Sequence, residues 1–474
     1  MEKRAVSEIE LVKKQSLAFY LKKKLTIIYL LILLFFIILA LTIKNINYLL
    51  LFLFFLLLLL PIFRSVIKGK FVFFEPINFV LITFFMYFIV APLYLILTNE
   101  FTVQIDIYSS IVTKGLLFCI LAFLSCYCGY ISDYGNRFAK LIPINKEPFN
   151  TKKIFKFACF LEFLAIGLIA LEVYFAKIQF KSLFALSLEY DYSSKWNYTE
   201  GNLIGLFHMG EALFIPAVLI LVAFWHHEKL SNIIKINILL IFIFYLLTAA
   251  RWRLILFTLS LFNLYLIRKK RKISLYKILI IGICVMIVMP IIGYYRSISG
   301  PEKTVMIRGD KYIKSVMSSL SIFETFLVII DNIPKNMDFL YGDVLLYIPK
   351  YFIPRKIWPD KPYPKELEII WALTGGRNLG YTAPLFGELY INFGIIGVIV
   401  GMFIFGVFCR TIYEYWKKKP ENITSQLILA LTSPYIISLI DRGYIIQHLY
   451  IIFNIYIPLI IAFIFSSKMI RIKL

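Results

Sequence analysis

The most regular feature of the chain is a series of long apolar runs separated by short polar segments. Twelve of these runs approach the length of about 20 residues that a helix needs to cross a bilayer. They cover 24–43, 47–63, 71–98, 110–132, 154–176, 205–225, 234–250, 254–267, 273–293, 384–411, 425–440 and 444–466. Because backbone polar groups in lipid must be paired internally, each run predicts a transmembrane helix. The pattern therefore predicts an all-α polytopic membrane protein, with residues 1–474 forming one integral membrane domain.

Two segments between the apolar runs are long, and we expect both to lie outside the membrane. They cover 177–204 and 294–383. The second contains apolar stretches at 315–330 and 343–353, which predict interfacial or re-entrant helices within a large external loop. Loops of this length in a compact protein are usually functional.

Lysine and arginine residues crowd into alternate loops. When the spans are threaded in order, the basic clusters all fall on one side of the membrane. The clusters lie within 3–24, 64–70, 137–153, 268–272, 417–419 and 468–473. Basic loops mark the cytoplasmic side of a membrane protein. We therefore expect both termini in the cytoplasm.

Composition agrees with the membrane interpretation and excludes a soluble domain. The chain is 60% hydrophobic and 17% charged, with a mean hydropathy of +0.81. Soluble domains are typically about 45–50% apolar and about 25% charged. The net charge of +23 comes mostly from the predicted cytoplasmic loops, so we expect a phospholipid bilayer as partner and no nucleic acid. The cysteines all lie in apolar runs, without the spacing of a zinc site or disulfide.

Basic residues also occur on the predicted external side, where few are expected. Arg251 and Arg253 stand out because they lie between two apolar runs with almost no loop. An arginine near the bilayer centre costs about 2.5–3.5 kcal/mol on insertion scales, which an anionic partner would offset. Other external basic residues are Arg355, Lys361, Arg377 and Arg442.

The side chain of arginine suits an anion site, because its fixed fork donates paired hydrogen bonds to phosphate oxygens. Several such residues around one pocket indicate a ligand with more than one negative charge. A lipid diphosphate satisfies both the charge and the location. The alternative is that these side chains extend to lipid phosphates at the membrane surface.

Three titratable residues near the external side are candidates for a catalytic base or for binding an acceptor. They are Glu388, His448 and His208. Glu388 shares a helix face with Asn392, four residues on. Both histidines have an ordinary pKa near 6.5 that suits proton transfer. The alternatives are an ion pair for Glu388 and simple packing for the histidines, and the sequence does not choose among the three.

Three segments carry a resemblance to a known family. They are Thr248–Arg253, Pro354–Pro362 with its three basic residues, one Trp and three prolines, and Pro384–Gly394 running into the tenth span. With the overall plan of many spans and one long external loop, they make the chain resemble the bacterial O-antigen and capsule repeat-unit polymerases, called Wzy.

The resemblance implies a membrane glycosyltransferase. Its donor would be a growing glycan on undecaprenyl diphosphate, and its acceptor one repeat unit on the same lipid. Similar enzymes work without a metal or other cofactor, and guanidinium groups would then stabilise the leaving diphosphate. Sugars would contact Trp358, Tyr363, Tyr381 and Asn392. A chain-length regulator and a flippase are expected partners at the cytoplasmic membrane, where the active site would face the periplasm.

Two other functions remain as alternatives. An O-antigen ligase uses the same donor, but ligases are expected to carry an important histidine in the large external loop, and 294–383 contains none. A repeat-unit flippase or transporter would place charges at the membrane midplane. Here the charges crowd the outer edge, which favours the polymerase.

Overall fold

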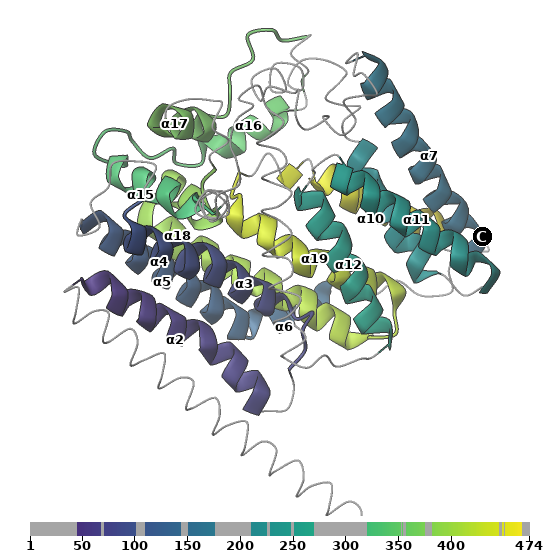
Figure 1. Cartoon of the computed structure of the whole chain (residues 1–474), viewed down its shortest axis with the longest axis horizontal. Coiled ribbons are helices and arrows are strands. Elements are labelled where there is room, and N and C mark those ends of the chain that lie inside the picture. Colours follow the sequence, from purple (N-terminus) through teal and green to yellow (C-terminus); the bar gives the residue numbers. More distant parts are fainter. Residues whose placement is uncertain are drawn as a thin grey trace, which may run out of the picture.

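The computed structural model describes residues 45–67, 71–100, 110–143, 150–175, 210–224, 228–247, 251–269, 320–351, 353, 357–374, 382–444, 448–449 and 451–466. Every regular element in these stretches is a helix, and none of the described residues is in a strand (Figure 1). Six of the described helical segments are long and apolar enough to cross a membrane, and three shorter helices are also apolar. The predicted class, an all-α polytopic membrane protein, is therefore confirmed.

The helices follow the predicted spans along most of the described chain. In order they are α2 (Ile46–Ile67), α3 (Pro76–Phe85), η1 (Met86–Val90), α4 (Ala91–Thr98), α5 (Ser110–Ile131), α6 (Tyr134–Leu141), α7 (Thr151–Phe175), α10 (Gly210–Ala223), α11 (Glu228–Leu247), α12 (Arg251–Lys269), α15 (Ile322–Asn332), α16 (Asp343–Tyr351), α17 (Lys365–Thr374), α18 (Leu385–Lys418), α19 (Ile423–Asp441), η4 (Ile452–Tyr456) and α21 (Ile457–Ser466). The predicted spans 24–43 and 273–293 and the predicted loop 177–204 lie outside the described residues.

One boundary differs from the sequence prediction in a way that affects the site. The predicted span 254–267 left Arg251 and Arg253 in the turn before it. The helix α12 instead begins at Arg251, so both arginines belong to its first turn. Hydropathy excludes the two arginines from the span because it scores each residue without its neighbours in the fold. In the structure, Arg253 is buried beside an acidic residue of another helix.

The helices form two packed groups joined by α19 (Figure 1). In the first group, α18 packs along α5 and α6, with α2, α3 and α15 around them. In the second group, α10 packs along α7 and contacts α11, α12 and α21. The helix α19 contacts α3 and α18 of the first group and α10 and α12 of the second. One continuous apolar core therefore connects the two groups.

The two ends of the bundle differ in charge. At one end, Phe73 packs against Phe262 of α12 and Phe74 packs against Trp416 of α18. Basic residues gather on the elements that reach this end, which we call the basic end. They are Arg64, Arg137, Lys140, Arg268, Lys269, Lys417 and Lys418. The opposite end is where α12 and α18 begin and α19 finishes.

Close contact between α5 and α18 depends on glycine. A Cβ at Gly129 would lie 2.0 Å from the carbonyl oxygen of Phe403, and one at Gly406 would lie 1.9 Å from that of Cys126. Small residues at such positions let two membrane helices approach backbone to backbone. This contact fixes how the start of α18 is placed over the rest of the first group.

Two π-helical turns precede prolines and direct tyrosines toward α19. The turn η1 comes just before Pro92, and η4 comes just before Pro458. A widened turn accommodates the proline ring and its missing N–H. Tyr87 of η1 donates a hydrogen bond to Asp441 Oδ2 at 3.2 Å, at the end of α19.

The large loop 294–383 is partly helical, as predicted, because α15, α16 and α17 lie within it. Residues 322–330 of α15 are all buried, and the helix contacts α5, α17 and α18. This helix is therefore part of the bundle, and α16 and α17 lie above it (Figure 1).

A kink in α18 attaches the loop to the bundle. The helix is interrupted at Phe393 and Gly394, and Gly394 has a φ of +60° that favours glycine. Asn392 sits at this break. Its Nδ2 donates to the Glu388 carbonyl at 2.9 Å, and its Oδ1 accepts from the Gly342 amide at 3.2 Å. The turn before α16 is thereby held against the first part of α18.

Candidate functional site

The candidate site lies at the end of the bundle opposite the basic end. Here the chain leaving α19 passes beside the start of α18, where the Gly443 amide donates to the Ala383 carbonyl at 2.9 Å. A Cβ at Gly443 would lie 2.6 Å from Cα of Leu385, so only glycine permits this approach. Two segments that are far apart in sequence therefore meet at one place.

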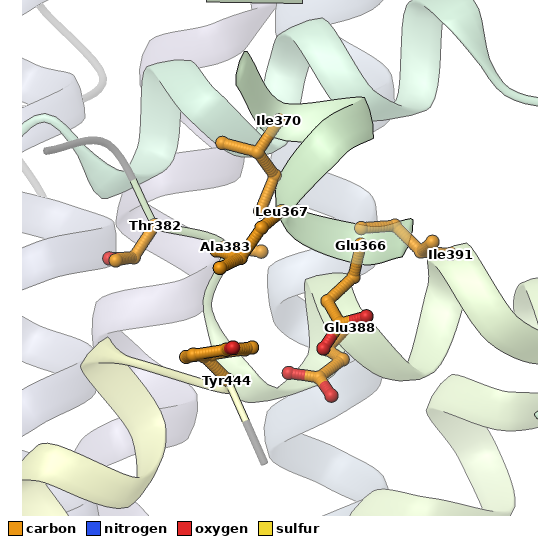
Figure 2. Close-up of a pocket in the computed structure, with 8 residues that line it drawn as sticks. All are labelled: Glu366, Leu367, Ile370, Thr382, Ala383, Glu388, Ile391 and Tyr444. Carbon is orange, nitrogen blue, oxygen red and sulfur yellow. The ribbon is translucent and has the colours of Figure 1, made fainter. Parts of the chain in front are cut away.

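A narrow pocket opens at this junction, beneath α17 (Figure 2). It encloses about 240 Å³ of space including its mouth, and its interior has room for a group about the size of a water molecule. Its lining comes from α17, α18, the segment before α18 and the segment after α19. The lining residues are Glu366, Leu367, Ile370, Thr382, Ala383, Glu388, Ile391 and Tyr444.

Two buried carboxyl groups face this pocket. Glu388 is 7% exposed and Glu366 is 1% exposed. Figure 2 shows both side chains turned toward the same space, with the ring of Tyr444 beside them. Neither carboxyl oxygen of Glu366 has a hydrogen-bond partner in the described part of the chain.

Burial raises the pKa of Glu366 to about 7, and the nearby charges of Asp343 and Glu368 act in the same direction. The group therefore exchanges its proton near neutral pH. Sequence reasoning missed Glu366. The available signal was its position in the second half of the long loop, between two of the three resembling segments, but no local pattern distinguishes it from Glu368.

Aromatic packing holds the first turn of α18, and with it Glu388, in a fixed position. Phe386 is fully buried, with ring centroids 4.8 Å from Phe326 of α15 and 4.9 Å from Phe88 of η1. Tyr390 packs on Phe118 of α5 at 5.2 Å. Glu388 lies between these anchors and points to the other side, into the pocket.

The predicted anion-binding residue Arg253 is 5% exposed and forms an ion pair with Glu211 of α10. Its guanidinium also lies 5.1 Å from the ring of Trp252. Farther along α12, Arg268 Nη1 donates to the Val222 carbonyl of α10 at 2.6 Å. The two contacts show that α10 and α12 run parallel, with the buried ion pair at the site end.

Arg442 and His448 lie together just after α19. A carbonyl oxygen can only accept, so His448 Nε2 carries the proton and donates to the Arg442 carbonyl. His448 Nδ1 then accepts from the Tyr435 hydroxyl at 2.6 Å. Both ring nitrogens are thus engaged, Nε2 by the Arg442 backbone and Nδ1 by Tyr435. The Arg442 guanidinium is half-buried and makes no ion pair with any other described residue.

Other predicted residues have identifiable contacts. Lys361 is 7% exposed, and its Nζ donates to the Ile353 carbonyl at 3.2 Å. Tyr363 packs edge-on against Trp371 of α17, with ring centroids 5.3 Å apart. Trp358 is half-buried, and its carbonyl accepts from the Lys361 amide. Asn392 uses its side-chain amide for the turn described above.

The remaining predicted residues are not placed. His208, Arg355, Arg377 and Tyr381 lie outside the described residues, and only the backbone of Arg251 is described. Within the described stretches, no three histidine, cysteine, aspartate or glutamate side chains are grouped as metal ligands. The structure thus brings Glu388, Arg442 and His448 to one region and adds Glu366 to it.

Comparison with known proteins identifies the family. The family model for the O-antigen polysaccharide polymerase Wzy matches residues 25–473. The chain belongs to this family. The resemblance seen in the three short segments therefore extends over almost the whole chain, and the recognition from sequence is confirmed.

Two curated relatives are similar over a shorter region. The O-antigen polymerases of Salmonella typhimurium and Salmonella typhi are each 31% identical to this chain over 142 residues. The matched region is 28% of this chain and 34% of each relative. No solved structure matches the chain.

Proposed function

We propose that the protein is a polysaccharide polymerase that joins lipid-linked repeat units at the outer face of the cytoplasmic membrane. The growing glycan would pass from undecaprenyl diphosphate to the non-reducing end of a new lipid-linked unit. The observation that carries this proposal is the match of the family model over residues 25–473. The arrangement of the site supports the proposal. The acidic and basic candidate residues meet at the end of the bundle opposite the basic end.

The chemistry requires a stabilised leaving group and a positioned acceptor. In this proposal the diphosphate of the donor is held by Arg442, together with Arg251, Arg253, Arg355, Lys361 and Arg377. Guanidinium groups that are already oriented stabilise the charge that develops on a leaving diphosphate. Arg442 suits this task best among the described candidates, because its backbone carbonyl is fixed by His448. Its guanidinium interacts electrostatically with the adjacent Asp441 but makes no direct ion pair with a described residue.

The acceptor unit would then approach from the side of the carboxyl pocket. Glu388 is the proposed residue for the acceptor, since the first turn of α18 holds it rigidly beside Tyr444. The aromatic rings of Trp358, Tyr363 and Tyr381, with Asn392, are the proposed sugar contacts. A metal has no place in this scheme, and both termini would lie in the cytoplasm.

Deletion of the gene, followed by gel analysis of the surface glycan, tests the reaction. We expect single repeat units in place of a ladder, restored by the wild-type gene. Loss of every capped unit would instead indicate a ligase or a flippase.

Arg442→Ala tests the diphosphate site in the same strain. We expect loss of the ladder at normal protein abundance, with partial recovery in Arg442→Lys, which keeps the charge and loses the fork. Lys335→Ala is the control, because Lys335 is an exposed basic residue of the large loop, and its ion pair among the described residues is with Asp331. A full ladder from Arg442→Ala would remove this residue from the proposed site.

A further inference from the structure

We infer that Glu366 is the proton acceptor of the transfer reaction, receiving the proton of the acceptor sugar's hydroxyl in the pocket it shares with Glu388. This inference rests on the proposed function and names a catalytic residue for it. It is carried by geometry: a carboxyl group that is 1% exposed, aimed into a pocket, with neither oxygen hydrogen-bonded to a described residue.

A buried carboxyl group without a partner is costly, and a folded protein rarely retains one for packing alone. At the corresponding position a hydrophobic residue would pack against Leu367 and Ile370, which line the same pocket. The open space in front of Glu366 has the size of a single hydroxyl or water. A sugar hydroxyl entering this space would supply the hydrogen bond that Glu366 lacks.

In the proposed step, a lone pair of the acceptor hydroxyl oxygen forms a bond to the anomeric carbon of the donor. The bond from that carbon to the diphosphate oxygen breaks, and its electron pair leaves with undecaprenyl diphosphate. The hydroxyl proton passes to the carboxylate of Glu366, which becomes a neutral acid and later returns the proton to water.

The groups around Glu366 favour this role over a permanent ion pair. Asp343 of α16, which forms an ion pair with Lys365, and Glu368 of α17 are both acidic, as is Glu388 across the pocket, and Tyr444 completes the titratable groups of the lining. No described residue of α15 lines the pocket. Burial, together with the charges of Asp343 and Glu368, keeps the proton affinity of Glu366 high, and a base with a pKa close to the working pH is the most effective.

Of the three bases suggested by sequence, His448 is less suited to the task. Both of its ring nitrogens are already used by Tyr435 and Arg442. Glu388 and Glu366 remain in the pocket. We assign the proton to Glu366, because neither of its carboxyl oxygens is hydrogen-bonded to a described residue.

The test uses full-length protein in lipid nanodiscs, with lipid-linked repeat units extracted from the strain that lacks this gene. Lengthening is followed on gels for wild type, Glu366→Gln, Glu366→Asp and Glu368→Gln. We expect Glu366→Gln to lower kcat about 100-fold with little change in KM. Glu366→Asp should keep part of the rate. Glu368→Gln, which removes a carboxylate from the exposed face of the same helix, should keep most of the wild-type rate and move its rise to lower pH.

The pH profile separates a base from a structural residue. The wild-type rate should rise as pH passes about 7, and this rise should be absent from the residual activity of Glu366→Gln. An undiminished Glu366→Gln rate, or a lowered rate that keeps the wild-type rise, would overturn the assignment alone. Wild-type protein that fails to lengthen the units would overturn the proposed function and the assignment with it.

Discussion

At the scale of single residues, the site end contains charged groups whose surroundings differ sharply. Arg253 is buried with Glu211 as a partner, Arg442 has its backbone fixed and its guanidinium available, and Glu366 is buried in an apolar pocket. Sequence reasoning treated the arginines alike, because each is a basic residue near the outer edge. Because the neighbours of these residues differ, we expect substitutions of them to have different effects.

Arg253→Met should destabilise the protein, because it leaves Glu211 buried without this counter-charge. Breaking one partner of a buried pair typically costs about 3–5 kcal/mol. Adding Glu211→Gln should restore most of the thermal stability measured in detergent. If Arg253 also holds diphosphate, the stable double variant will still make no ladder; a restored ladder would show that the arginine serves only the fold.

Glu366 should make stability depend on pH. Its pKa rises from 4.5 when exposed to about 7 in the fold, so the folded protein favours the protonated form. The resulting stability is fully present below pH 4.5 and is lost as pH rises through about 7. The full difference is roughly 3 kcal/mol, at 1.36 kcal/mol per pKa unit.

Thermal unfolding at several pH values checks this expectation. Wild type should lose stability between pH 4.5 and about 7 relative to Glu366→Gln. Parallel curves for the two proteins would show that Glu366 does not titrate in this range.

At the scale of helices, close approach of α5 and α18 positions the start of α18. Gly406→Ala would place a Cβ 1.9 Å from the Cys126 carbonyl oxygen, so the helices must move apart. We expect lower thermal stability by a few kcal/mol and a shortened ladder, since Glu388 lies on the same helix. Gly167→Ala in α7 is the matched control, because nothing lies within 4 Å of its Cβ position.

The kink of α18 illustrates the limit of element prediction. The apolar run 384–411 predicts one helix, and hydropathy gives no sign that residues 393 and 394 leave the helical conformation. The break occurs because the turn at 340–342 bonds to Ile391 and Asn392, which only the fold brings together. Similarly, the stretch 315–330 looks interfacial by composition, but α15 has enough neighbours to be buried.

At the scale of the whole molecule, the basic end and the site end form two poles. The last turns of α2, α12 and α18, which carry described basic residues of the predicted cytoplasmic loops, lie at the pole away from α17 (Figure 1). We therefore expect the pocket to face the periplasm.

Cysteine labelling in a background without the native cysteines checks this orientation. Asp360→Cys lies in an exposed turn of the large loop, and Glu421→Cys lies in the exposed turn between α18 and α19. A membrane-impermeant maleimide should label the first in cells with a permeable outer membrane and the second only after lysis. The reverse pattern would contradict the predicted topology.

The sequence by itself determined the membrane class, most of the described spans, the segregation of basic loops and the family, because hydropathy, charge and short motifs are local properties of the chain. It also indicated Glu388 and Arg442. Only the tertiary structure paired Arg253 with Glu211, engaged both nitrogens of His448 and placed Glu366 beside Glu388. These relations join residues that are distant along the chain, and packing of α10, α12, α17, α18 and α19 decides which of them meet.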